Sequence, residues 1–278
     1  MGQFFEPVGA SEVIDLLRVA TVLMAFLVGA ANLAADEART GVIFTGDFES
    51  GSMAPYGDSR DFTVEKTQIV TDPVRAGQHA LKVTLDRVAD VDRCNHRTDF
   101  WLRGMGQSLQ QGQDCWYAVS IYLPEDWQPD TQAELWVQWV LGKAVSEVGG
   151  PQLAIYVYGD GYRVRKRWGP ALEQHENIWL GDVLADRGKW TDWVFHVRWS
   201  PGDDGLIELW RDGELVATDT GQNCVAADYA PYFKFGIYKW PWKQDATQTP
   251  STATKREIYF DEIRIADDRG SFEAVSPQ

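Results

Sequence analysis

The chain has 278 residues, 44% of them hydrophobic and 24% charged, as expected of a globular protein with a substantial core. Its 41 acidic residues against 26 basic ones give a net charge of −15, which argues against binding to nucleic acid or to an anionic membrane surface. Thirteen Trp, ten Tyr and twelve Phe are a heavy aromatic load. Aromatic side chains favour β-strands and also form the flat surfaces on which sugar rings stack.

The N-terminal segment differs from the rest of the chain. An uncharged run from Val19 to Ala35 is near the minimum length for spanning a bilayer and ends in small residues typical of a signal-peptide cleavage region. Acidic residues dominate the stretch before it, where a signal peptide normally carries positive charge. We predict that residues 1–35 are a signal peptide or an N-terminal membrane anchor. Residues 36–278 would then form one exported domain, secreted or periplasmic.

Three widely spaced cysteines, Cys94, Cys115 and Cys224, form no CxxC pair, which argues against structural zinc. They allow one disulfide, with three alternative pairings, or three buried free thiols. An oxidising compartment after export would favour the disulfide.

From residue 41 onward the apolar residues recur with a period of two, the pattern of half-buried β-strands. The sequence contains no long amphipathic helix and no repeat of 20–50 residues. We predict a single all-β domain, a jelly-roll sandwich of two antiparallel sheets in which alternate residues of one sheet face a concave groove. In chain order, strands are expected within residues 79–88, 115–124, 133–142, 151–161, 191–200, 206–219 (a hairpin around Asp212-Gly213), 231–240 and 256–267.

The first polar segment within these strands contains His96, Arg97 and Asp99. An imidazole titrates near neutral pH, and a guanidinium forms a two-pronged donor for a carboxylate. Asp99 is placed to orient Arg97. The alternative is a surface turn stabilised by an Arg–Asp pair.

The second is Gln138, which stands in an otherwise apolar strand. Strict alternation places Trp136, Gln138 and Val140 on one face and Val137 and Trp139 on the other. Because burying an unpaired amide is unfavourable, Gln138 either faces the groove or is hydrogen-bonded in the core.

The third segment, residues 162–168, carries four basic residues between Tyr162 and Trp168. This concentration of positive charge in an acidic protein suits an anionic ligand. A basic outer strand face is the alternative.

The fourth is the strand around Lys234 and Tyr238. A period of two puts these residues on one face with Tyr232, Gly236 and Trp240, and the intervening Phe and Ile side chains on the core face. Gly236 is predicted to leave a gap where a ligand approaches the backbone. Such a face is typical of a site for an acidic sugar.

These segments resemble the β-jelly-roll polysaccharide lyases of the heparin lyase I and glucuronan lyase type, which are related to alginate lyases. The similarity runs over nearly the whole chain after Gly41, and its most specific part is the YxKxGxY pattern that ends at Tyr238. The resemblance implies a concanavalin-like fold and places the family's lysine and catalytic tyrosine at Lys234 and Tyr238. Arg97 and Gln138 match the family's arginine and strand glutamine, and the Glu of the family's R-x-E segment is Asp99 here.

One departure concerns a histidine. Many relatives carry Gln-x-His where this chain has Gln138-Trp139-Val140, which leaves His96 as the candidate histidine. The resemblance implies β-elimination from a 4-linked uronic acid, with glucuronan the favoured polymer and a C4–C5 double bond in the product. Arg97 and Gln138, with Asn95 a lesser candidate, would neutralise the substrate carboxylate.

Either Tyr238 or His96 would then be the base, and Lys234 would lower the pKa of Tyr238. The candidate substrate-binding residues are Asn95, Tyr232, Trp240, Trp136, Arg165 and Arg167. No organic cofactor is required. Glu49 and Asp261, in the expected first and last strands, are candidate ligands for a structural Ca²⁺, with two surface acids as the alternative.

The expected partner is an anionic polysaccharide, bound by a monomer that touches a membrane only through an uncleaved N-terminal anchor. A non-catalytic carbohydrate-binding module or lectin on the same fold is the first alternative. A glycoside hydrolase is the second, although the E-x-D-x-E strand typical of such an enzyme is missing from the sequence.

Overall fold

The computed structural model describes residues 40–52, 66–87, 96–102, 108–142, 150–243 and 251–277. These residues form fourteen β-strands and three short helices. The strands are β1 (Val42–Gly46), β2 (Thr67–Val70), β3 (Ala80–Asp86), β4 (Arg97–Trp101), β5 (Asp114–Tyr122), β6 (Asp130–Val140), β7 (Leu153–Gly159), β8 (Gly161–Trp168), β9 (Gln174–Asp182), β10 (Trp190–Arg198), β11 (Leu206–Arg211), β12 (Glu214–Thr220), β13 (Tyr232–Tyr238) and β14 (Lys255–Ala266). The helices are η3 (Leu184–Asp186), η4 (Trp240–Lys243) and α3 (Phe272–Val275).

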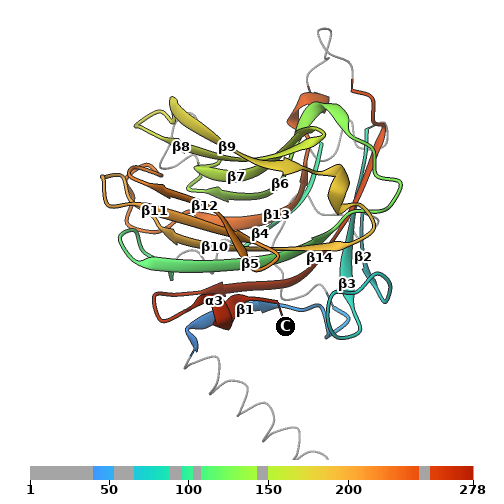
Figure 1. Cartoon of the computed structure of the whole chain (residues 1–278), viewed down its shortest axis with the longest axis horizontal. Helices are drawn as coiled ribbons and strands as arrows, with labels where there is room; N and C mark the ends of the chain where they lie inside the picture. The colour runs from blue at the N-terminus through green and yellow to red at the C-terminus, as the bar shows by residue number, and fades with distance from the viewer. Residues whose placement is uncertain are drawn as a thin grey trace, which may run out of the picture.

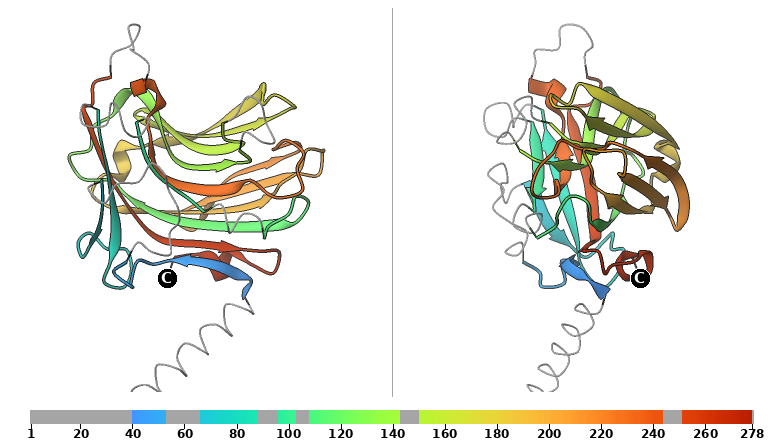
Figure 2. Two further views of the ribbon diagram at one scale, coloured as in Figure 1. Left: turned by 180° about the vertical axis from the view of Figure 1, so that it is seen from behind. Right: turned by 90° about the vertical axis from the view of Figure 1, so that its left-hand side faces the viewer.

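The strands assemble into two antiparallel sheets that pack face to face (Figure 1). The larger, eight-stranded sheet has the order β12-β11-β10-β5-β14-β3-β2, with β1 also pairing with β14. The six-stranded sheet has the order β4-β13-β6-β7-β8-β9, and its strands curve along their length (Figure 2). The predicted all-β jelly-roll sandwich is therefore confirmed.

Aromatic side chains fill much of the space between the sheets. Trp139 of β6 lies 4.6 Å from Phe195 of β10 and 5.2 Å from Phe233 of β13, measured between ring centroids. Phe235 of β13 similarly meets Phe260 of β14 at 5.5 Å. The period of two in the sequence arises from these alternate side chains, which bury their apolar area against the opposite sheet.

The prediction for Trp136 is wrong. The register of β6 against β7 shifts between Leu135 and Val137, so strict alternation fails at this point. Trp136 is 1% exposed and packs edge-on against Trp127 and Tyr162, which belong to the core. Its side chain is part of the sandwich interior rather than a surface for substrate.

Two of the three cysteines lie in the described part of the chain. Cys115 and Cys224 are buried free thiols, and burial raises the pKa of each to about 12. Cys94 lies outside the described residues.

The predicted signal peptide or anchor at residues 1–35 also lies outside the described residues. Within the described ranges, no helix has the length and apolar character needed to cross a membrane.

Candidate functional site

The first and last polar segments of the sequence meet on neighbouring strands. In the register of β13 against β4, Tyr238 pairs with Arg97 and Gly236 with Asp99. Since the core-facing residues of β13 are its Phe and Ile side chains, Arg97, Asp99 and Tyr238 project from the outer face of the six-stranded sheet.

Asp99 is the centre of this cluster. Its carboxylate lies 2.5 Å from the Lys234 Nζ, and it accepts hydrogen bonds from Gln138 Nε2 (3.2 Å) and Trp101 Nε1 (2.9 Å). The Lys234 ammonium also lies 4.1 Å from the centre of the Trp101 ring. Asp99, Lys234 and Gln138 are all buried, so the ion pair and its hydrogen bonds hold three strands in a fixed arrangement.

Arg97 is the cation in contact with Tyr238. Its guanidinium carbon lies 3.8 Å from the centre of the Tyr238 ring, and its Nη1 is 4.0 Å from Asp99 Oδ2. Asp99 therefore lies beside Arg97, at the outer limit of an ion pair. The expectation that Lys234 is the cation acting on Tyr238 has to be revised, because Lys234 is paired with Asp99 and Arg97 stacks on the phenol ring.

Gly236 has a different role from the one predicted. Its φ is +129°, and a Cβ at this position would lie 2.3 Å from the Thr98 carbonyl oxygen and 2.7 Å from Asp99 Cα. The space beside Gly236 is thus filled by the backbone of β4, and the predicted gap for a ligand is wrong. The glycine instead allows β4 to approach β13 closely enough to place Asp99 beside Lys234.

His96 lies at the start of β4, with a positive φ of 54°. Its side chain is buried and packs edge-on against Trp242, with ring centroids 6.2 Å apart. Its carbonyl oxygen accepts a hydrogen bond from the Lys239 backbone N–H at 2.9 Å. The histidine therefore joins β4 to the segment that follows Tyr238. Asn95 lies outside the described residues.

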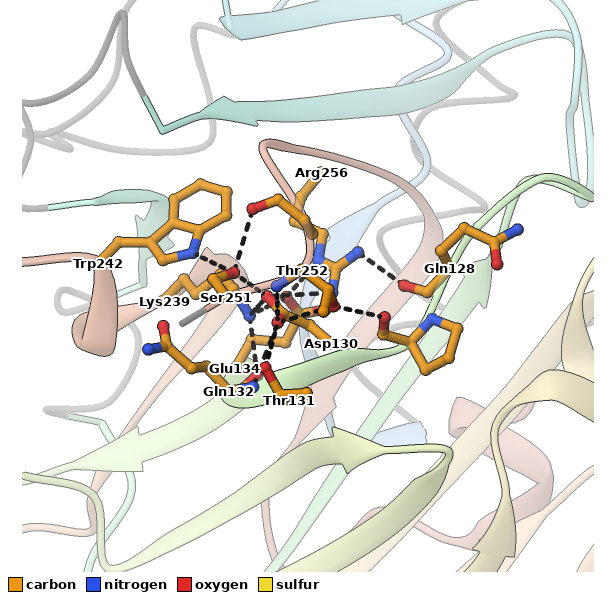
Figure 3. A network of polar contacts seen from close by, with 12 residues as sticks. Gln128, Asp130, Thr131, Gln132, Glu134, Lys239, Trp242, Ser251, Thr252 and Arg256 are labelled. Atoms are coloured by element: carbon orange, nitrogen blue, oxygen red, sulfur yellow. Dashed lines mark hydrogen bonds and ion pairs between the residues drawn. The ribbon is translucent and has the colours of Figure 1, made fainter. Parts of the chain in front are cut away.

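A buried group of four charges supports this end of the site (Figure 3). Lys239 Nζ lies 2.8 Å from Asp130 and 3.2 Å from Glu134, and Arg256 Nε donates to Glu134 at 2.7 Å. Burial alone would raise both carboxyl pKa values, but Lys239 and Ser251 outweigh it at Asp130 and lower its pKa to about 2. At Glu134, Arg256 and Lys239 likewise outweigh burial and lower the pKa. The network links β6, β14 and the residue directly after Tyr238.

Lys239 is not among the residues that we predicted from the sequence, although its position in the strand pattern could have identified it. A period of two puts it on the same face as Phe233, Phe235 and Ile237, and a lysine on a core face requires buried counter-charges. The structure supplies them from Asp130 and Glu134.

Two predicted aromatic residues flank the cluster. Tyr232 is buried, with its ring 6.1 Å from that of Trp101. Trp240 belongs to η4 rather than to β13, and its ring lies 5.9 Å from Tyr238 and 5.6 Å from Tyr156. Trp240 is partly exposed and so extends the outer face beside Tyr238.

The basic strand β8 divides its cations between two faces. The Arg165 guanidinium lies 4.5 Å from the Tyr156 ring centre and its Nε donates to Asn177 at 2.8 Å, on the outer face. Arg167 donates two hydrogen bonds to the Leu172 carbonyl, at 2.9 and 3.1 Å. Lys166 points the other way and forms a 2.5 Å ion pair with Asp219 of the eight-stranded sheet. The alternative prediction for residues 162–168, a basic outer strand face, is therefore wrong for Lys166.

The two candidate calcium ligands each hold a backbone segment. Glu49 accepts hydrogen bonds from the backbone N–H of Gln78 and of His79, both at 2.8 Å. Asp261 accepts from the backbone N–H of Arg75 and of Glu262, at 3.0 and 2.8 Å. Among the described residues, no group of three or more His, Cys, Asp or Glu side chains is arranged to hold a metal ion. Calcium binding by this pair stays a prediction.

Comparison with known proteins identifies the family. The family model described as "Polysaccharide lyase" matches residues 48–264. The chain belongs to the polysaccharide lyase family. No curated protein sequence matches it.

Solved structures resemble this polysaccharide lyase in fold. The endo-β-1,4-glucuronan lyase from the fungus Trichoderma reesei has a TM-score of 0.69 and 21% identity, covering 85% of this chain and 99% of that one. The alginate lyase Aly36B has a TM-score of 0.50 and 12% identity, covering 84% and 96%. The binding domain of botulinum neurotoxin DC, in complex with SialylT, has a TM-score of 0.53 and 8% identity, covering 85% and 50%.

The fold alone does not separate the predicted enzyme from the alternative of a binding module, because a toxin binding domain shares it. The family match decides the question: the chain is a lyase that acts on a polysaccharide.

Proposed function

We propose that this polysaccharide lyase cleaves a 4-linked uronic-acid polymer, with glucuronan the first choice, by β-elimination. The observation that carries the proposal is the arrangement of Arg97, Gln138, Lys234 and Tyr238 around Asp99 on one outer sheet face. The likeness in fold to a glucuronan lyase, which extends over almost all of that enzyme, supports the choice of polymer.

Cleavage begins with loss of the proton on C5, which is hardly acidic while the neighbouring carboxylate is ionised. Hydrogen bonds and positive charge at that carboxylate stabilise the enolate-like dianion as it develops. Arg97 and Gln138 suit this role, since one is a cation and the other an amide donor on adjacent parts of the same face. The C5–H electrons then form the C4–C5 double bond, the C4–O4 bond breaks, and O4 takes up a proton.

Tyr238 is our candidate for the group that takes the C5 proton. Its side chain is partly exposed, whereas His96 is 4% exposed and lies against Trp242. The Arg97 guanidinium lies over the Tyr238 ring, 3.8 Å from its centre, so the group that would hold the substrate carboxylate stands beside the candidate base. His96, as a residue that ties β4 to η4, then positions Arg97 rather than acting as the base.

Location and assembly belong to the same proposal. A polymer of uronic acid cannot cross a cell membrane unaided, so an exported enzyme fits this substrate. We expect the enzyme to act outside the cytoplasm. We also expect it to be a monomer, and sedimentation of the purified protein would measure its oligomeric state.

The first experiment is a substrate panel. Protein spanning residues 36–278 is incubated with glucuronan, alginate, pectate, hyaluronan, heparin and ulvan, and the ultraviolet absorbance of the unsaturated uronate product is followed. We expect a rise with glucuronan. A rise with another uronate polymer alone would correct the choice of substrate, and a flat trace with every polymer would contradict the proposal.

Substitution of Tyr238→Phe tests the base. Loss of the hydroxyl removes the proton acceptor but leaves the ring under Arg97, so we expect kcat to fall at least about 100-fold, within the range typical of acid–base groups, while binding of glucuronan persists. Tyr229→Phe is the matched control, because the Tyr229 hydroxyl donates to the Leu141 carbonyl instead of lying beside Arg97. Unchanged cleavage by Tyr238→Phe would exclude this residue as the base.

A further inference from the structure

Two exposed aromatic rings and an arginine form a cluster at the far edge of the six-stranded sheet. Tyr158 of β7 and Trp179 of β9 are 46% and 57% exposed, an unusual exposure for side chains of this size. The Arg163 guanidinium of β8 lies close to both rings, 5.1 Å from the Tyr158 ring centre and 5.4 Å from that of Trp179. We call these three residues the distal platform.

Arg163 keeps its charge available. Among the residues that the structure describes, no carboxylate forms an ion pair with it, and its Nε has no hydrogen-bond partner. In a protein with a net charge of −15, an arginine beside two half-exposed aromatic rings and without an acidic partner among the described residues is unexpected. A ligand that combines carboxylates with flat sugar rings would satisfy both features.

The position of Trp179 is built into the neighbouring strand. A Cβ added at Gly161 would lie 1.8 Å from Cη2 of the Trp179 ring, so the ring rests directly on this glycine. Any larger residue at 161 would displace the ring. The exposed tryptophan thus packs against the β8 backbone at Gly161.

The platform lies in line with the proposed site. Successive strand pairs place Tyr238 opposite Leu135, Leu135 opposite Tyr156, Tyr156 opposite Arg163, and Arg163 opposite Trp179. The row therefore crosses four strand spacings of about 4.8 Å, or roughly 19 Å from β13 to β9. These two strands lie near opposite edges of the sheet (Figure 1).

We propose that the distal platform is a subsite for the anionic polysaccharide chain, several sugar residues away from the bond that is cleaved. Arg163 binds a uronate carboxylate there, and Trp179 and Tyr158 stack against sugar rings. The inference rests on the proposed function and extends it. A long chain can reach the platform and the site at Tyr238 together, but a short one cannot, so the platform selects for polymer over short oligosaccharides.

The test compares long and short substrates with Trp179→Ala and Arg163→Ala. For each variant we expect KM for glucuronan to rise roughly tenfold, the effect of losing one charge-assisted or stacking contact, with kcat unchanged. For a short oligoglucuronate, kcat/KM should equal that of the unchanged enzyme. Leu215→Ala is the matched control, because Leu215 is 53% exposed but lies on β12 of the other sheet.

Gly161→Ala gives an independent check, since it displaces the Trp179 ring without removing it. We expect it to raise KM for the polymer as Trp179→Ala does, with the thermal midpoint confirming that the variant is folded. A polymer KM that stays unchanged in Trp179→Ala and Arg163→Ala, or an equal rise for long and short substrates, would overturn the subsite.

The failure of the subsite and the failure of the proposed function are distinguishable. If no polymer is cleaved by the unchanged enzyme, the lyase proposal for polyuronates fails, and direct binding of glucuronan by calorimetry still tests the platform. Binding that is equal in the unchanged protein and in Trp179→Ala would then overturn it. If glucuronan is cleaved with the same KM by the unchanged enzyme and by Trp179→Ala, Arg163→Ala and Gly161→Ala, the subsite is overturned and the lyase proposal stands.

Discussion

At the level of single residues, the site depends on Asp99, a carboxylate that is 1% exposed and shared by Lys234, Gln138 and Trp101. A buried ion pair contributes little net stability compared with apolar residues of the same size, but removing one partner leaves an uncompensated charge. The main effect of the Asp99–Lys234 pair is therefore to fix the positions of the side chains near Tyr238.

This predicts a specific pattern of unfolding free energies. Asp99→Ala should destabilise the protein by about 3–5 kcal/mol, because the Lys234 ammonium stays buried without its counter-charge. The double variant Asp99→Ala with Lys234→Met should regain most of this stability while cleavage stays lost. Denaturant unfolding measures the first quantity and product absorbance the second. A double variant as unstable as Asp99→Ala would show that the charge is not the cause.

At the level of elements, the distance between β4 and β13 controls the site. Gly236 lets the Thr98–Asp99 backbone lie where a Cβ would otherwise be, and the register shift in β13 after Phe235 occurs at the same place. Beyond the strand, the buried charges of Asp130, Glu134, Lys239 and Arg256 anchor the chain that leads from Tyr238 into η4 (Figure 3).

Gly236→Ala should therefore impair function more than its backbone strain alone explains. A strained non-glycine conformation alone costs about 1–3 kcal/mol. We expect the free energy of unfolding to fall by more than this, together with a large fall in kcat. Gly213→Ala is the control: Gly213 also has a positive φ, of 82°, but nothing lies within 4 Å of an added Cβ. If the two variants lose equal stability and both keep full activity, the close approach of β4 is unimportant for catalysis.

At the level of the whole molecule, two buried carboxyl groups give opposite pH dependences. Burial raises the pKa of Asp261, in the strand β14 at the centre of the eight-stranded sheet, to about 7. For Asp130, Lys239 and Ser251 outweigh the effect of burial and lower the pKa to about 2. Between pH 4 and 7 the folded protein thus keeps a proton on Asp261 that the unfolded chain releases.

The sign of the effect follows from linkage. As pH rises from about 4 to 7 the contribution of Asp261 to stability is lost, whereas the contribution of Asp130 is lost as pH falls from about 4 to 2. The thermal midpoint of the unchanged protein should fall between pH 4 and 7, and Asp261→Asn should reduce this fall. Each kcal/mol of unfolding free energy corresponds to roughly 2–4 °C in the thermal midpoint. Calorimetric scans over this range measure it. Parallel curves for the variant and the unchanged protein would contradict the assignment.

The local pattern of the sequence determined the fold class and much of the site. Alternation depends only on the geometry of an extended chain, so the core face of β13, with Phe233, Phe235 and Ile237, and its outer face, with Lys234 and Tyr238, could be assigned without knowing any partner strand. Arg97 and Gln138 could be named as candidates before their contacts were known, from their residue types in these segments and from the family resemblance.

Only the tertiary structure decided which of these residues touch. The pairing of Lys234 with Asp99, the stacking of Arg97 on Tyr238, the burial of Trp136 and the row from Tyr238 to Trp179 all depend on strand order, register and bulges. Strand order and register are set by packing between segments far apart in the chain, and one bulge is enough to turn a side chain to the opposite face.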